Sequence, residues 1–353
     1  MSKGAFHIPS LDGLRAVSFS IVFVAHAGLD RLVPGGFGVT VFFFLSGFLI
    51  TTLMRMEFDK SKTVGFKGFY LRRVLRILPP FYLVLTVATL LTAAGLLAGE
   101  LRPPAVAAQF LHYANYWIVL NGYSGQALGT GVYWSLAVEE HFYFLFPWLY
   151  LALRKANAAP RTQALVLWGL CALILAWRCF LVFGQHAPTD RTYLASDTRF
   201  DSILFGAALA VWGNPVLDGD PKGGLSLWKW ALLPAGVGAL LVSFLFRDDA
   251  FRETFRYSLQ GLALYPVFIV GVRAPDFLPF KLLNTRPAAF LGLLSYSLYL
   301  VHHVVLFGLQ HHLPDLNPWL RGALGFAISL GLSYGIYRLV EQPAAAFRKR
   351  LQS

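Results

Sequence analysis

Long apolar runs, separated by polar and basic segments, make up most of the chain. Examples are residues 81–98, 165–177, 232–246 and 323–337. With their flanking residues, such runs approach the ~20 residues with which an α-helix crosses the ~30 Å hydrocarbon layer of a membrane. The pattern therefore predicts transmembrane helices.

About ten spans of this kind are expected. They lie close to residues 12–31, 36–54, 77–98, 133–153, 163–183, 197–213, 229–246, 255–273, 287–309 and 320–340. The segment 105–120 is also apolar, but it is short and is followed by Asn121, so we expect it to be re-entrant or interfacial. The prediction is an all-α polytopic membrane protein that forms one transmembrane domain over residues 1–353.

Composition excludes a soluble domain. Of the 353 residues, 56% are hydrophobic and only 14% are charged, whereas soluble domains carry about 25% charged residues. The net charge of +12 alone would suit a nucleic-acid-binding protein. The basic residues lie mostly between the apolar runs, however, which is the distribution found in membrane proteins. We therefore expect the lipid bilayer as a partner, and no nucleic acid.

The connections between the expected spans differ strongly in charge. Every second connection is basic, and together these hold Arg55, Lys60, Lys62, Lys67, Arg72, Arg73, Arg76, Arg154, Lys155, Arg161, Lys222, Arg273, Lys281 and Arg286. The other connections hold only Arg31, Arg102, Arg191, Arg247, Arg252 and a few boundary residues. Because basic connections stay on the cytoplasmic side, we expect a multi-pass protein of the inner (cytoplasmic) membrane with both termini in the cytoplasm. This orientation requires that residues 105–120 do not cross.

The start of the chain allows a second interpretation. Lys3, the apolar run 16–25 and the small residues around position 26 resemble a signal peptide with its cleavage site. Cleavage would discard Arg15 and His26, which are costly side chains to place in lipid without a purpose. We therefore favour a first span that is retained.

Arg15 and His26 share one face of the first expected span. Placing a charged side chain in the middle of a bilayer costs several kcal/mol, so such a side chain usually faces a cavity and has a partner. Eleven residues make about three helical turns, which separates the two side chains by ~16 Å along the axis. A snorkelling arginine and a packed histidine would also explain them, but imidazole suits general-base work near neutral pH.

A second arginine pair lies at the basic end of the third span. Arg73 and Arg76 are three residues apart and share a helix face. They can anchor the helix at lipid phosphates, or they can bind the phosphate groups of a cytoplasmic substrate, which guanidinium groups contact in pairs.

Further ionisable residues lie within the expected spans. Glu139 and Glu140 begin the fourth span, where the helix dipole favours them and where a carboxylate can also orient a histidine. For Arg199 and Asp201 we expect a structural ion pair, whereas His302 is a candidate for either packing or a site. Arg178 and Arg338 lie near span ends, where snorkelling is expected. No spacing among these residues is that of a metal site, so no metal is expected.

Taken in order, these motifs resemble the acyltransferase family 3 membrane proteins. The matching segments are Ser10–Ala16 with His26, Gly38–Val39 with Phe42–Ile50, Arg73-x-x-Arg76 with Pro79, Trp134-Ser135-Leu136 through Tyr143, Arg199-x-Asp201, Ser295-Tyr296 through His302, and Glu341-x-Pro343. Each motif alone is weak, but together they span nearly the whole chain in the family's order.

The resemblance implies transfer of an acyl group, commonly acetyl, from acyl-CoA to a hydroxyl, commonly on a carbohydrate or glycoconjugate. Acyl-CoA would be a co-substrate, and no permanently bound cofactor is implied. The family's Arg-x10-His corresponds to Arg15 and His26, its Arg-x-x-Arg to Arg73 and Arg76, and its usual acidic position to Glu139. Some relatives carry a further esterase-like C-terminal domain. This chain ends at Ser353 without one, so we expect the membrane domain to handle the acceptor.

The expected mechanism assigns His26 as the general base that deprotonates the acceptor hydroxyl. Arg73 and Arg76, together with Arg15, would hold the CoA phosphates. Glu139 or Glu341 would orient the imidazole, and Glu139 suits His26 better in membrane depth. A covalent acyl-histidine remains an alternative to direct transfer. The acceptor also remains open among a sugar polymer, peptidoglycan, a lipid-linked oligosaccharide and a small glycosylated metabolite.

A proton-coupled transporter or flippase of a small or lipid-linked substrate is the alternative function. Such carriers also place ionisable residues inside the membrane. The two halves of the sequence show no symmetry that would indicate a carrier built from repeats, so the acyltransferase hypothesis is favoured.

Overall fold

The computed structural model describes residues 8–351, and all regular elements in this part of the chain are helical. The α-helices are α1 (Leu11–Val24), α2 (Gly35–Ser61), α3 (Phe66–Ala93), α4 (Pro103–Phe110), α5 (Ala114–Asn121), α6 (Trp134–Lys155), α7 (Pro160–Cys179), α8 (Thr189–Leu194), α9 (Ser196–Val211), α10 (Gly224–Leu227), α11 (Leu233–Leu245), α12 (Asp249–Glu253), α13 (Phe255–Arg273), α14 (Phe280–Leu283), α15 (Arg286–His312), α16 (Pro318–Ile336) and α17 (Gln342–Arg350). Single turns of π-helix (Ala25–Leu29, Phe180–Gly184, Trp228–Leu232, Tyr337–Glu341) continue α1, α7, α10 and α16. The all-α fold expected from the sequence is confirmed.

Eight helical stretches within the described residues are long and apolar enough to cross a membrane. They are Leu11–Leu29, Gly35–Ser61, Phe66–Ala93, Pro160–Gly184, Gly224–Leu245, Phe255–Arg273, Arg286–His312 and Pro318–Arg350. Each overlaps one of the expected spans, although some bounds differ; Phe66–Ala93, for example, begins well before the expected span 77–98. The polytopic membrane architecture is therefore confirmed.

Two of the expected spans do not meet these criteria, although both are helices. The span expected at 133–153 is α6, which has 22 residues but carries Glu139, Glu140 and His141 in its first half. The span expected at 197–213 is α9, which has only 16 residues and would cover about 24 Å of the ~30 Å layer. Other helices enclose α9, since 14 of its residues are buried.

The apolar segment at 105–120 is not one helix. It divides into α4 and α5, each of 8 residues, which are separated by a break at 111–113. A helix of that length covers about 12 Å and does not cross a bilayer. This agrees with the expectation that the segment does not span.

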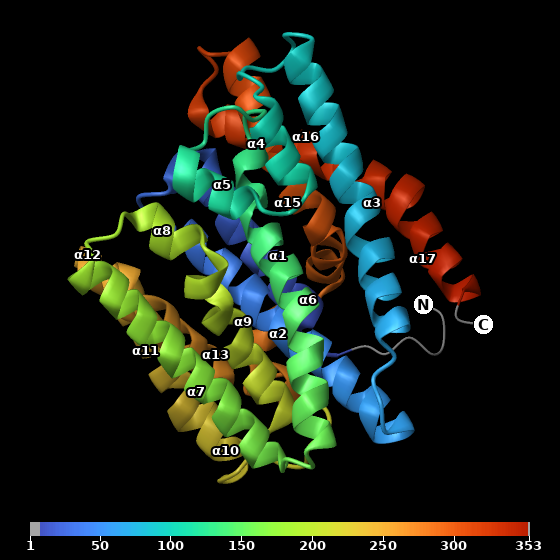
Figure 1. Ribbon diagram of the computed structural model, residues 1–353. Helices are drawn as coiled ribbons and strands as arrows, with labels where there is room; N and C mark the ends of the chain where they lie inside the picture. The colour runs from blue at the N-terminus through green and yellow to red at the C-terminus, as the bar shows by residue number, and fades with distance from the viewer. Residues whose placement is uncertain (1–7, 352–353) are drawn as a thin grey trace.

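The long helices form a bundle in which α2 and α9 lie at the centre (Figure 1). On one side of α2, successive contacts run through α1, α15 and α16. On the other side, α9 packs against α7 and α13, and α11 covers α13. The short helices α4, α5, α8 and α12 lie between the ends of the long ones (Figure 1). The centre of the bundle is therefore made by helices distant in sequence.

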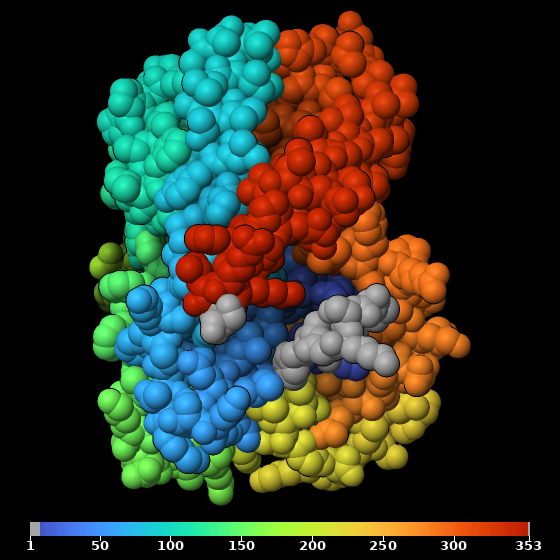
Figure 2. Space-filling model, turned by 90° about the vertical axis from the view of Figure 1, so that its right-hand side faces the viewer, coloured from blue at the N-terminus to red at the C-terminus, as the bar shows by residue number. Residues whose placement is uncertain are grey.

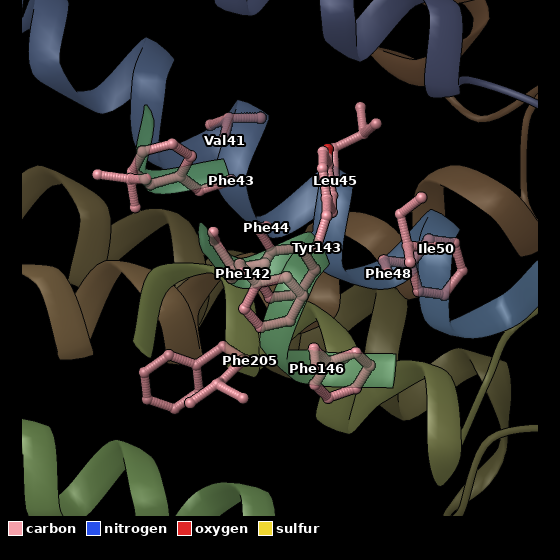
Figure 3. Packing of buried hydrophobic residues seen from close by; sticks show 14 of the residues in the cluster. Val41, Phe43, Phe44, Leu45, Phe48, Ile50, Phe142, Tyr143, Phe146 and Phe205 are labelled. Carbon is pink, nitrogen blue, oxygen red and sulfur yellow. The ribbon is translucent and has the colours of Figure 1, made fainter. Parts of the chain in front are cut away.

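Glycines allow α2 and α9 to approach closely. A Cβ atom added to Gly47 would lie 1.9 Å from the carbonyl oxygen of Ile203, and one added to Gly206 would lie 1.9 Å from that of Phe44. Small residues commonly permit such backbone contact between membrane helices. Around the crossing, Phe43, Phe44 and Phe48 of α2 pack with aromatic side chains of α6 and with Phe205 of α9 (Figure 3).

Hydrogen bonds and ion pairs join the basic connections at one end of the bundle. Arg55 forms an ion pair with Asp218 at 2.5 Å, and Arg154 forms one with Asp59 at 2.5 Å. The side chain of Arg273 donates to the carbonyl oxygen of Asp218. We call this the basic end of the bundle.

The opposite end has its own contacts between connections. Thr192 donates a hydrogen bond of 2.5 Å to Glu253, and Arg247 donates one of 3.4 Å to the carbonyl oxygen of Arg31. Successive connections between the long helices thus lie alternately at the basic end and at the opposite end. The sequence predicts this alternation.

Candidate active site

His26 lies where α1 ends. The helix widens into the π-helical turn Ala25–Leu29 and is interrupted at Gly28, whose φ of 109° lies outside the helical range. Single π-turns often occur at functional positions because they redirect a side chain. The ring of His26 is exposed to a cavity of about 800 Å³ near the end of the bundle opposite the basic end. We call this space the large cavity.

Two further histidines surround His26. Its Nδ1 atom lies 2.9 Å from Nε2 of His302, which is completely buried. The ring of His303 stacks on that of His26 with centroids 4.2 Å apart, and His303 also lines the large cavity. In the sequence, His26 and His302 are separate candidates. The structure brings them together.

The hydrogen bonds determine where the protons of this pair reside. Nδ1 of His302 lies 2.8 Å from the carbonyl oxygen of Tyr299 and 3.1 Å from that of Leu298. A carbonyl oxygen only accepts, so Nδ1 of His302 carries the proton and its Nε2 atom is an acceptor. Nδ1–H of His26 then donates to His302. The Nε2 atom of His26 is left with a free lone pair, which is the state required of a general base.

Close packing of α1 and α15 places the two histidines together. A Cβ atom added to Gly292 would lie 1.9 Å from the carbonyl oxygen of Asp12. The two helices therefore meet backbone to backbone near the basic end. From this contact, the helices extend to a second contact at Phe19, whose ring lies edge-on to that of His302 at 5.6 Å.

Arg15, Arg73 and Arg76 converge on a second, smaller cavity of about 110 Å³, which we call the arginine pocket. Arg15 forms an ion pair with Asp12 at 2.7 Å. Arg73 is buried, and its Nε atom has no hydrogen-bond partner among the described residues. None of the ion pairs within residues 8–351 involves Arg73 or Arg76. Arg73 and Arg76 thus have no carboxylate of the described residues at ion-pair distance, although Glu139 lines the same pocket, and guanidinium groups of this kind can bind an anion.

The helices that carry these arginines border an opening in the molecular surface. Figure 2 shows a hollow between α17 in red, α2 and α3 in light blue and the orange helices, with dark-blue atoms of α1 visible inside it. Arg348 of α17 is close enough to Arg72 and Arg76 to interact electrostatically with them. The C-terminal helix therefore adds positive charge beside the arginine pocket.

Glu139 also lines the arginine pocket. The hydroxyl group of Tyr143 lies 3.3 Å from Oε2 of Glu139 and 2.5 Å from the hydroxyl group of Ser46. The structure does not bring Glu139 to His26; the ring of His26 contacts His302 instead, at 2.9 Å. Membrane depth alone suggested Glu139, and the sequence did not show which helix faces α1.

The two cavities share part of their walls. Val39 and Tyr299 line both of them, and so separate the arginine pocket from the large cavity. The hydroxyl group of Tyr299 lies 2.7 Å from that of Ser135 and donates to the carbonyl oxygen of Val132 at 2.9 Å. Tyr299 lies three residues before His302 and so about one helical turn away on α15.

The expected ion pair between Arg199 and Asp201 is not formed. Asp201 pairs with Arg178 of α7 at 2.7 Å, and both side chains are completely buried. Arg178 therefore does not snorkel, which corrects that expectation as well. Arg199 instead donates to the carbonyl oxygen of Tyr193 at 3.0 Å and lies 4.1 Å from the centre of the Tyr257 ring.

Glu341 lies in the π-helical turn after α16 and accepts a hydrogen bond of 2.5 Å from Ser297 of α15. It is close enough to Arg76 for electrostatic interaction, so it belongs to the surroundings of the arginine pocket. Within residues 8–351, no group of three or more His, Cys, Asp or Glu side chains is arranged to hold a metal ion.

Comparison with known proteins agrees with this geometry. The model of an acyltransferase domain family matches residues 8–338. The peptidoglycan O-acetyltransferase OatA of Listeria monocytogenes is 29% identical over an alignment of 357 residues. The alignment covers 96% of this chain and 56% of the relative. The O-acetyltransferase OatA of Staphylococcus aureus is 27% identical over 351 residues, which cover 96% of this chain and 57% of the relative.

The chain thus spans just over half the length of these curated relatives. No solved structure matches it. The match of the family model extends from before α1 into the turn that follows α16, and so includes every element that lines the two cavities. The chain therefore belongs to this acyltransferase family, as a multi-pass membrane member.

Proposed function

We propose that this protein is an O-acyltransferase that moves an acetyl group from acetyl-CoA to a hydroxyl group of a carbohydrate or glycoconjugate. One observation carries the proposal. An imidazole with a free lone pair faces a cavity large enough for a sugar, and a pocket of arginines lies on the other side of a shared wall. The family match and the O-acetyltransferase names of the relatives support the same reaction.

The arginine pocket is the proposed donor site. Three guanidinium groups around about 110 Å³ suit phosphate groups and are too confined for a whole CoA molecule. The nucleotide would therefore extend out of the pocket towards α17, where Arg348 adds a further positive charge. The pantetheine arm would point inward, towards Val39 and Tyr299.

The large cavity is the proposed acceptor site. Its volume of about 800 Å³ lies within the ~300–1,000 Å³ that is usual for small-molecule sites. Nε2 of His26 would take the proton of the acceptor hydroxyl while that oxygen attacks the thioester carbonyl. The C–S bond then breaks, and the CoA thiolate recovers the proton from the imidazolium. His302 holds the ring of His26 in the required tautomer throughout.

The geometry also suggests the direction of transfer. With the basic end in the cytoplasm, acetyl-CoA would enter the arginine pocket from inside and the acceptor would enter the large cavity from outside. The name of the Listeria monocytogenes relative suggests peptidoglycan as a candidate acceptor. We propose the inner membrane as the location, with both termini cytoplasmic.

Release of CoA by the purified protein tests the proposed reaction. In nanodiscs with acetyl-CoA and a mixture of cell-wall and envelope glycans, the protein should release free CoA and transfer labelled acetyl to a glycan. Release is followed with a thiol reagent. A carrier of the same fold would show neither product, and that result would contradict the proposal.

A further inference from the structure

Arginines gather around the large cavity, at the end of the bundle where basic residues are scarce. Of the five arginines that the sequence places in the less basic connections, Arg31, Arg247 and Arg252 line this cavity. Arg256, at the start of α13, is a fourth. Positive charge on this side is not explained by the rule that places basic connections in the cytoplasm, so another cause is required.

The arginines outside the cavity differ from those inside in their partners. Arg102 forms an ion pair with Glu100 at 3.1 Å, and Arg191 forms one with Asp197 at 2.5 Å. Both of these pairs are complete within the chain. Neither arginine lines the large cavity.

Two of the cavity arginines lack such a partner. None of the ion pairs within residues 8–351 includes Arg31 or Arg247. Both side chains are exposed, and the one hydrogen bond of the Arg247 guanidinium within residues 8–351 goes to the backbone carbonyl of Arg31, at 3.4 Å. These two guanidinium groups are therefore available to an anion at the mouth of the cavity.

The other two cavity arginines are only weakly neutralised. Arg252 is 3.7 Å from Asp249, whose side chain is 95% exposed, and Arg256 is 3.9 Å from Glu253. The Nε atom of Arg256 is buried and has no hydrogen-bond partner in the described part of the chain. With Asp30 and Glu253 as the carboxylates of the lining, four arginines face two acids.

Aromatic rings form much of the remaining wall of the cavity. Tyr123, Trp134, Tyr193 and Tyr257 line it together with the arginines. Tyr123 is exposed and Tyr193 is half-buried, whereas Trp134 and Tyr257 are buried. The accessible rings can pack against the apolar face of a sugar, and their hydroxyl groups can supply hydrogen bonds. A purely lipid-facing cleft would not need this combination of aromatic rings and guanidinium groups.

We infer that the large cavity selects an anionic acceptor, a saccharide that bears a carboxylate or phosphate group next to the hydroxyl to be acylated. Arg31 and Arg247 bind the anionic group, the aromatic wall holds the sugar ring, and His26 faces the hydroxyl. This inference rests on the proposed function, because it concerns the acceptor of that reaction. It adds a class of acceptor and the residues that recognise it.

Matched saccharides test the inference. The panel consists of oligosaccharides bearing carboxylate or phosphate, each paired with its neutral analogue, in which the carboxyl group is reduced or the phosphate removed. Binding is measured by calorimetry to the full chain in nanodiscs of zwitterionic lipid. The wild-type protein should bind the charged member of at least one pair about tenfold more tightly or better, and added salt should weaken this preference.

The variants identify the groups responsible. The double variant Arg31→Gln, Arg247→Gln should lose most of the preference, whereas Arg102→Gln, at the same end but outside the cavity, should keep it. If no pair shows a preference for charge in the wild-type protein, or if the double variant keeps the preference, the inference is wrong. Arginine-dependent binding of phosphatidylglycerol alone, without any charged saccharide, would also overturn it.

CoA release by the wild-type protein distinguishes a failure of this inference from a failure of the proposed reaction. If the reaction proposal fails, wild-type protein releases no CoA with any acceptor, whatever its charge preference in binding. If only the inference fails, CoA release proceeds and charged and neutral acceptors serve equally well.

Discussion

Replacing His302 by phenylalanine should slow acyl transfer without weakening the binding of either substrate. His302 lines neither cavity, and it contacts His26 through the 2.9 Å hydrogen bond between their rings. Phenylalanine retains the aromatic ring beside Phe19 but offers no acceptor to Nδ1–H of His26. The imidazole is then free to rotate, and either of its tautomers can form.

The size of the effect follows from the hydrogen bond that is lost. A donor left without its partner in a buried or partly buried place costs about 1–3 kcal/mol, which corresponds to about a 5- to 150-fold decrease in kcat. This is smaller than the loss expected on removal of the base itself, about 10²- to 10⁴-fold. His302 is thus a positioning residue. The KM values for acetyl-CoA and for the acceptor should stay within about twofold, because neither site loses a contact.

Two further variants distinguish positioning from a general packing defect. His302→Gln places an amide oxygen near the position of the lost acceptor and should recover part of the rate. Phe326→Leu alters a ring that packs against Phe23, with centroids 5.4 Å apart, in the same hydrophobic cluster, and it should leave kcat nearly unchanged. Initial rates of labelled acetyl transfer in nanodiscs provide the measurement. An unchanged kcat in His302→Phe would refute the assignment of the tautomer, and so would an equal loss in Phe326→Leu.

Three further sets of variants test other parts of the structure. Arg73→Ala and Arg76→Ala should each raise the KM for acetyl-CoA by roughly 10- to 150-fold, since a charge-assisted contact contributes ~1.5–3 kcal/mol; normal acetyl-CoA binding in a correctly inserted variant would show that the arginines only anchor the helix. Asp201→Asn should lower stability by about 3–5 kcal/mol, because it leaves a completely buried arginine without its counter-charge; an unchanged denaturation midpoint in detergent would contradict this. In a background without native cysteines, Thr63→Cys should react with an impermeant maleimide only after the cells are opened, whereas Ser124→Cys should react in intact cells; the reverse pattern would invert the orientation.

The sequence identified most of the membrane helices because the relevant signal is local. An apolar run of sufficient length indicates a span whatever surrounds it, and the expected start at 12–31 corresponds to the helical stretch Leu11–Leu29. The exceptions are also physical. The helix α9 is shorter than a bilayer is thick, and α6 carries acidic residues, so neither meets the criterion of length and apolarity on its own.

The candidate residues stand out in the sequence because ionisable side chains are costly to place in lipid. The sequence does not show which residues they pair with. Arg199 and Asp201 are two residues apart and point to different sides of α9, where Asp201 meets Arg178 of α7. Which helices are neighbours depends on contacts between distant segments, such as the glycine contacts of α2 with α9. A single sequence carries no direct signal for such contacts.

The partner of His26 shows the same limit. Membrane depth suggested Glu139, and depth does not determine which way a helix faces. The structure packs α15 against α1, so that His302 reaches His26, while Glu139 lines the arginine pocket. The π-helical turn that carries His26 was not predictable either, because its geometry depends on Gly28 and on the surrounding packing.

The most direct test of the account is acetyl transfer by His26→Ala. The variant should insert and fold normally, because the ring is exposed to the large cavity and its removal leaves no buried void. It should still bind acetyl-CoA with the affinity of the wild-type protein, because the arginine pocket is separate. Transfer of labelled acetyl from acetyl-CoA to the acceptor should fall by about 10²- to 10⁴-fold. Transfer at the wild-type rate by a correctly folded His26→Ala protein would contradict the assignment of His26 as the base.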